Sequence, residues 1–163
     1  MKQTYRVVSG LIALGVVVQA AAIAYGWFDA LNGVNNGLVI DDNYDGNAGH
    51  ALHGIVGLYV MPLLGLILLI VSFFAAKAVP GARRWAGIVF GLILLQVVLG
   101  FVSYGAPIVG ALHGINALAV LATATRASAL AGTQRSARRR GTDPVEVPTQ
   151  ATGPAAPRST RPV

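Results

Sequence analysis

Two histidines occupy the same position of a repeated pentapeptide, and their chemistry is the first clue to function. The sequence Ala-Leu-His-Gly-Ile stands at residues 51–55 and again at residues 111–115, so His53 and His113 each lie near the start of a long apolar segment. If both segments enter a membrane from the same side, the two imidazoles lie at the same depth in one helical bundle. Neutral imidazole is a common metal ligand, and a haem iron can take one on each side.

An ionisable side chain inside a membrane span costs roughly 1–3 kcal/mol unless it is paired, so both histidines need partners. Ligation of a haem b iron by His53 and His113 is the leading hypothesis. Hydrogen bonds across a helix interface are the plainer explanation. A metal ion or a small-molecule pocket is a further alternative.

Nearby residues that could surround a bound group are His50, Gly57, Gln96 and Tyr104. Gly57 falls on the helical face of His53. As a buried amide, Gln96 could bond across helices or contact the edge of a cofactor. His50 has Gly110 as its repeat counterpart, so we expect it at the water boundary and solvated; contact with a haem propionate or a metal is the alternative.

The composition is typical of an integral membrane protein. Of the 163 residues, 55% are hydrophobic and 11% are charged, and there is no cysteine. The net charge of +6 comes from short basic flanks and from the C-terminal part of the chain, which indicates membrane topology rather than nucleic-acid binding. No nucleophile with an adjacent base, phosphate-cradling loop or zinc signature is visible, which argues against hydrolytic and phosphoryl-transfer enzymes.

The hydropathy pattern predicts an all-α integral membrane fold, a four-helix transmembrane bundle built from two tandem helical hairpins. The expected domain is residues 1–127, with spans at residues 7–28, 50–76, 85–104 and 108–125. The first run resembles a signal peptide, but Gly10, Gln19 and Tyr25-Gly26 are echoed by Gly87, Gln96 and Tyr104-Gly105. We therefore expect the first run to be a retained helix.

The charge distribution predicts the orientation of these spans. Basic residues precede the first span, separate the second from the third and follow the fourth, whereas the loop of residues 29–49 contains Asp but no Lys or Arg. The positive-inside rule then gives a multi-pass protein of the cytoplasmic (inner) membrane, N-in/C-in, with this loop extracytoplasmic. Residues 128–163, rich in Ala, Arg, Thr and Pro, are predicted to form a disordered cytoplasmic tail.

The acidic loop contains a partial calcium motif. Asp41, Asn43 and Asp45, followed by Gly46, match the opening of a Ca²⁺-binding loop, in which alternate oxygens converge on the ion. The twelfth position of that motif is Leu52 instead of the usual Glu. A solvated turn is therefore the favoured interpretation, with a weak Ca²⁺ site as the alternative.

One segment resembles a known family. The run Gly91-Leu-Ile-Leu-Leu-Gln-Val-Val-Leu-Gly100, the turn Gly105-Ala106-Pro107 and Ala111-Leu112-His113 resemble the second helical hairpin of a heme A synthase half. The resemblance covers about residues 7–126, in helix number, histidine placement and a Gln–Gly–turn–His pattern. Each half of that family holds a haem through one histidine on its second helix and one on its fourth. The resemblance thus implies that His53 and His113 are axial ligands.

Three departures argue against heme A synthase activity itself. The chain supplies only one half, so a second haem is missing unless the protein forms a homodimer. His50 stands where the family commonly has an acidic residue, three positions before the histidine of the second helix. No Arg or Lys lies on the outer side to meet haem propionates.

The sequence therefore leads to a small b-type haem protein in electron transfer or haem handling, and leaves enzymatic activity open. Its expected partners are the lipid bilayer and a membrane redox partner or larger complex. The alternative is a cofactor-free accessory or scaffold subunit of a membrane complex, in which the histidines are structural. A small-solute transporter is a weaker alternative, because no acidic or basic residue lies within a span.

Overall fold

A computed structural model of the protein describes the backbone of residues 1–140 and the side chains of residues 1–132. All regular structure in this part of the chain is helical. The elements are α1 (Lys2–Asn35), α2 (Ala48–Ile55), the π-helical turn η1 (Val56–Val60), α3 (Met61–Ala75), α4 (Ala82–Gly105) and α5 (Val109–Arg140). Because α2, η1 and α3 follow one another without a break, they form one long helix, and the four long helices are each apolar and long enough to cross a membrane.

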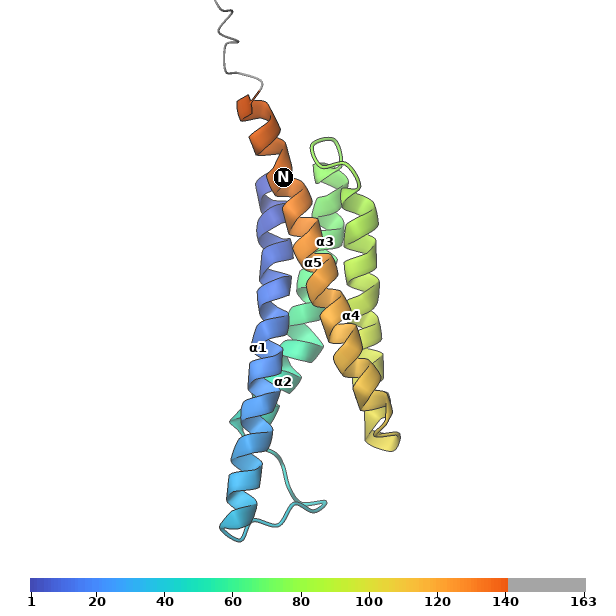
Figure 1. Ribbon diagram of the computed structural model, residues 1–163. Helices are drawn as coiled ribbons and strands as arrows, with labels where there is room; N and C mark the ends of the chain where they lie inside the picture. Colours follow the sequence, from blue (N-terminus) through green and yellow to red (C-terminus); the bar gives the residue numbers. More distant parts are fainter. Residues whose placement is uncertain (141–163) are drawn as a thin grey trace, which may run out of the picture.

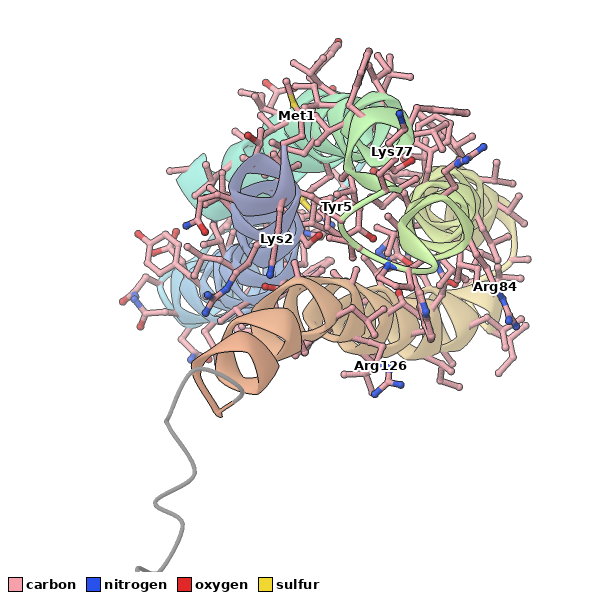
Figure 2. All side chains as sticks on the ribbon, turned by 90° about the horizontal axis from the view of Figure 1, so that it is seen from above. Met1, Lys2, Tyr5, Lys77, Arg84 and Arg126 are labelled. Carbon is pink, nitrogen blue, oxygen red and sulfur yellow. The ribbon has the colours of Figure 1, made fainter. Side chains whose placement is uncertain are left out.

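The four helices form a bundle of two hairpins, as predicted (Figure 1). The N-terminus and the C-terminal part of α5 lie at the same end of the bundle, and the loop between α1 and α2 lies at the other end. Figure 2 looks down on the end that carries the N-terminus and labels Lys2, Lys77, Arg84 and Arg126 there. The basic residues that predicted the topology are thus gathered at one end.

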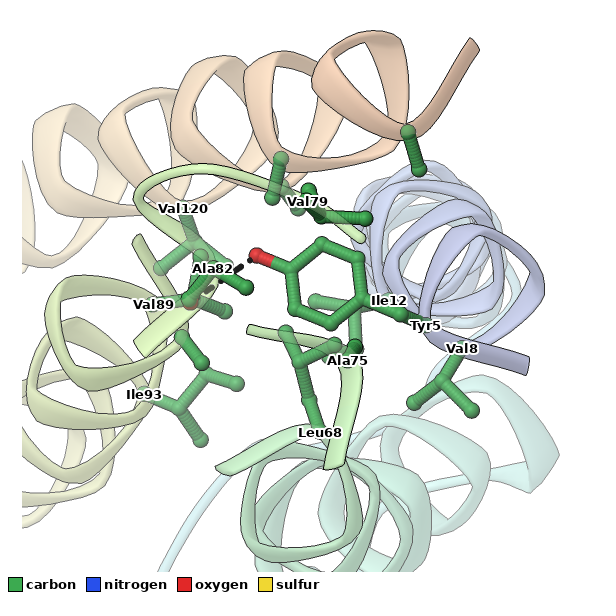
Figure 3. Close-up of a cluster of buried hydrophobic side chains, with 14 of the residues drawn as sticks. Tyr5, Val8, Ile12, Leu68, Ala75, Val79, Ala82, Val89, Ile93 and Val120 are labelled. Carbon is green, nitrogen blue, oxygen red and sulfur yellow. Dashed lines mark hydrogen bonds between the residues drawn. The ribbon is translucent and has the colours of Figure 1, made fainter. Parts of the chain in front are cut away.

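The hydrophobic core includes Tyr5 and Val8, which lie near the start of α1 (Figure 3). Tyr5 is completely buried there, and its hydroxyl donates a hydrogen bond to the carbonyl of Ala82 at 3.1 Å, which links the start of α1 to the start of α4. Small residues such as Ala75 and Ala86 are also completely buried. Small side chains let membrane helices approach closely, and here they lie buried between the helices.

Two helices are longer than predicted. The first continues to Asn35 instead of residue 28, and α5 continues to Arg140. Residues 128–140 of the predicted disordered tail are instead helical, and the start of this segment packs against α1: Ala131 is buried, and the Ser128 hydroxyl donates to the carbonyl of Arg6 at 3.2 Å. Residues 141–163 of the predicted tail lie outside the described residues.

The π-helical turn η1 accommodates Pro62. Proline has no backbone N–H, and its ring crowds the carbonyl four residues earlier, here that of Leu58. The wider π turn, closed by a bond from the N–H of Met61 to the carbonyl of Val56, relieves this crowding. The extra residue also shifts the helical register after His53, and both His53 and Met61 face α1: His53 Nδ1 lies against the carbonyl of Gln19, and the Met61 side chain packs against Gly15.

Candidate functional site

The structure brings His53 of α2 and His113 of α5 together at the end of the bundle away from the N-terminus. Their ring centroids are 6.2 Å apart, and the ring planes are inclined by 58°. The predicted common depth of the two histidines is thus confirmed. A metal ion held linearly between two imidazole nitrogens, at about 2 Å from each, would separate the ring centroids by roughly 6 Å. The observed separation of the centroids is close to this value.

Each imidazole is oriented by a backbone carbonyl of the preceding long helix. His53 Nδ1 lies 3.1 Å from the carbonyl oxygen of Gln19 in α1, and His113 Nδ1 lies 3.1 Å from that of Gln96 in α4. A carbonyl oxygen only accepts, so Nδ1 carries a proton in both rings, and the neutral form of each ring has its lone pair on Nε2. Metal-bound histidines are commonly oriented in the same way. The repeat thus produces two matching pairs, each of a histidine and a glutamine carbonyl.

Neither Nε2 atom has a hydrogen-bond partner within the part of the chain that the structure describes. Both histidines are partly buried rather than surrounded by water. Each carbonyl bond uses Nδ1, one of the two nitrogens of the ring. The other nitrogen, Nε2, remains available to coordinate a metal. Two neutral imidazoles with available Nε2 atoms are suitable ligands for iron, zinc or copper.

A second layer of hydrogen bonds braces His113. The side-chain Nε2 of Gln96 donates to the backbone carbonyl of His113 at 3.0 Å. Asn116, which is 7% exposed, donates through Nδ2 to Oε1 of Gln96 at 2.7 Å and to the carbonyl of Leu92 at 2.9 Å. Of the two alternatives for Gln96, the structure shows the hydrogen bond across helices. Asn116 completes this network. It could be found from the sequence by its position three residues after His113, on the same helical face.

The glycines near the pair fall into two kinds. A Cβ atom added at Gly54 or Gly114 would meet nothing within 4 Å, so no protein neighbour requires glycine there. A Cβ at Gly57 would lie 3.0 Å from the side-chain nitrogen of Gln19, which shows that Gly57 packs against that amide. A Cβ at Gly100 would lie 3.4 Å from Cε1 of His113. The chain therefore packs closely beside His113 and leaves open space next to each histidine along its helix.

His50 belongs to a separate cluster. Its Nδ1 lies 3.0 Å from Oδ1 of Asn47, the residue that caps α2, and its ring meets Trp27 and Tyr44 edge to face, with centroids 5.0 and 6.1 Å away. Its Nε2 is buried and has no partner among the described residues. The expectation that His50 is solvated is wrong, because the loop after α1 folds Tyr44 and Gly46 over the ring.

Two other predicted residues lie apart from the pair. Tyr104 is 90% exposed, and its side chain makes no hydrogen bond within the described part of the chain. In the acidic loop, Oδ1 of Asp41 accepts a bond from the backbone N–H of Asn43 at 2.9 Å, which forms the favoured turn. No group of three or more His, Cys, Asp or Glu side chains that could hold a metal occurs among the described residues. Calcium binding by Asp41, Asn43 and Asp45 stays a prediction.

Comparison of the chain with known protein families, with curated proteins and with solved structures finds no match in any of the three. The resemblance to a heme A synthase half stays a prediction that rests on the residues quoted for it.

Proposed function

We propose that the protein is a multi-pass protein of the cytoplasmic membrane that binds haem b between His53 and His113 and serves in electron transfer or haem handling. The observation that carries this proposal is the matched pair of imidazoles. Their rings lie 6.2 Å apart, and each Nδ1 is held by a glutamine carbonyl. Hydrogen bonds between helices explain the orientation of both Nδ1 atoms. They explain neither the spacing of the rings nor the two Nε2 atoms that have no hydrogen-bond partner among the described residues.

The surroundings of the pair fit a flat apolar group. Gly54 and Gly114 leave the backbone open beside each histidine. Leu52 and Leu112, which precede the histidines, are about half exposed, so apolar side chains are available to cover a porphyrin. A bound haem would supply one-electron redox chemistry. The chain would hold the iron through the two Nε2 atoms, orient the rings through the glutamine carbonyls and limit the access of water.

The charge distribution supports the N-in/C-in orientation. Lys2, Lys77, Arg84 and Arg126 lie at the end of the bundle that carries the N-terminus (Figure 2), and the loop with Asp41 and Asp45 lies at the other end. Positive residues are retained on the cytoplasmic side. In this orientation the histidine pair lies in the outer part of the bundle, near the extracytoplasmic surface.

Absorption spectroscopy tests the proposal directly. Protein purified in detergent from a haem-replete host should carry near-stoichiometric haem, with a low-spin reduced spectrum and sharp α and β bands. The double variant with His53→Ala and His113→Ala should lose the pigment. His50→Gln is the matched control, because glutamine at this position of α2 keeps the capping interaction, and its spectrum should be unchanged. A colourless wild-type protein would contradict the proposal and favour a cofactor-free accessory subunit.

A further inference from the structure

We infer that the two histidines are not equivalent: His113 is the fixed ligand, and His53 is an exchangeable one that a small neutral ligand of reduced iron, such as carbon monoxide, can replace. This inference rests on the proposed haem binding and adds a ligand-binding activity to it. In the exchange, the bond between iron and His53 Nε2 is broken and one bond between iron and the incoming ligand is formed. Nothing is oxidised or reduced.

The asymmetry begins with one difference between the repeats. After the shared pentapeptides the chain continues as Val56-Gly57-Leu58 in the first copy and as Asn116-Ala117-Leu118 in the second. Asn116 bonds to both Gln96 and Leu92 of α4. Its counterpart Val56 has no side-chain donor. The bond that braces the glutamine beside His113 therefore cannot form beside His53.

The glutamine beside His53 shows the consequence. The side-chain oxygen Oε1 of Gln19 is buried and has no hydrogen-bond partner among the described residues. No bond joins the Gln19 side chain to the backbone of His53 in this part of the chain, whereas Gln96 donates to the carbonyl of His113. His53 is thus held to α1 by its own Nδ1 bond to the Gln19 carbonyl, and His113 is held to α4 by a network of bonds.

The backbone differs in the same direction. The π-helical turn η1 begins at Val56, three residues after His53, whereas α5 continues as a regular α-helix beyond His113. Turns of this kind have weaker hydrogen-bond geometry and occur frequently at functional sites. The backbone that follows His53 is therefore held less firmly than the backbone that follows His113.

Three measurements on the full-length protein in detergent test this inference. His53→Ala should keep most of its haem in a five-coordinate state and bind carbon monoxide rapidly once reduced. His113→Ala should lose most of its haem. Asn116→Val, which copies the first repeat, should lower haem affinity roughly tenfold, the loss expected for a partner behind a metal ligand. Val56→Asn is the matched opposite change, and should slow the replacement of His53 by carbon monoxide in the otherwise unchanged protein.

The outcomes separate this inference from the proposed function. A wild-type protein that binds no haem overturns the proposed function, and the inference with it. A low-spin wild type whose two alanine variants lose haem equally overturns only the inference. Should His113→Ala not fold, amide hydrogen exchange of the haem-free wild type decides: faster exchange in α2 than in the first turns of α5 supports the inference, and equal protection overturns it.

Discussion

His113 and Gln96 bind each other twice across the interface of α4 and α5. The imidazole Nδ1 of His113 lies 3.1 Å from the carbonyl of Gln96, and the side-chain nitrogen of Gln96 donates to the carbonyl of His113 at 3.0 Å. In the first hairpin, His53 and Gln19 form only the first of these bonds. We therefore expect the two glutamines to have different effects on stability, although their positions in the repeat correspond.

Replacing each glutamine by leucine should reveal this difference. Gln96→Leu leaves the carbonyl of His113 and a donor of Asn116 without their partner, so we expect a loss of about 1–3 kcal/mol in the free energy of unfolding. Gln19→Leu removes a buried acceptor that already has no partner, so its stability should be unchanged or higher. Unfolding in mixed detergent micelles, followed by circular dichroism, compares the two variants. Equal losses would contradict the asymmetry.

Gly49 of α2 lies directly against the backbone of α1. A Cβ atom at Gly49 would lie 2.6 Å from both the carbonyl oxygen of Ala22 and the Cα atom of Gly26, which are backbone atoms that cannot turn away. Gly49→Ala should therefore destabilise the protein by about 1–3 kcal/mol, the usual cost of overpacking. Gly87→Ala in α4 is the control, since its Cβ meets nothing within 4 Å. The thermal midpoint in detergent should fall for the first variant and stay level or rise for the second.

Asn47 joins the start of α2 to the outer part of α1. Its Oδ1 accepts bonds from the backbone N–H groups of Gly49 and His50, and its Nδ2 donates to the carbonyl of Gly26 at 2.8 Å and to Asp29 at 2.9 Å. Asn47→Ala removes both functions and should cost about 1–2 kcal/mol, the upper part of the range for a lost helix cap.

Asn47→Asp separates these two functions. It keeps the acceptor for the cap but loses the donor to Gly26 and brings a negative charge next to Asp29. Its stability should fall between wild type and Asn47→Ala at low ionic strength and recover in part as salt screens the repulsion. A salt-independent stability would show that the contact with Asp29 is not formed in solution.

Single cysteines can establish the orientation, because the natural chain has none. Asn36 lies in the exposed loop after α1, and Ala78 lies in the exposed turn between α3 and α4. In intact cells, an impermeant maleimide should label Asn36→Cys, whereas Ala78→Cys should react only after the membrane is permeabilised. The reverse pattern would contradict the N-in/C-in orientation.

The four helices and the proximity of the histidines were predictable because both follow from short-range patterns: uncharged runs of sufficient length and a repeated pentapeptide. The helix ends were not, since packing against another helix overrides local composition. Ala131 and Ser128 lie in a polar, Ala-rich segment, yet they stay helical because α1 lies beside them. The burial of His50 could not be predicted for a similar reason, because Trp27 comes from another helix and Tyr44 from a long loop.

The length of α1 determines how the protein meets its outer surroundings. At 34 residues it measures about 51 Å, whereas the hydrocarbon layer of a bilayer is about 30 Å thick. In the proposed orientation, its last turns stand clear of the lipid and carry the loop with Asp41 and Asp45 outward. A soluble electron carrier arriving from that side would meet the end of α1 and its negatively charged loop before it touched the membrane. A carrier with a positive contact face would therefore be attracted at low salt.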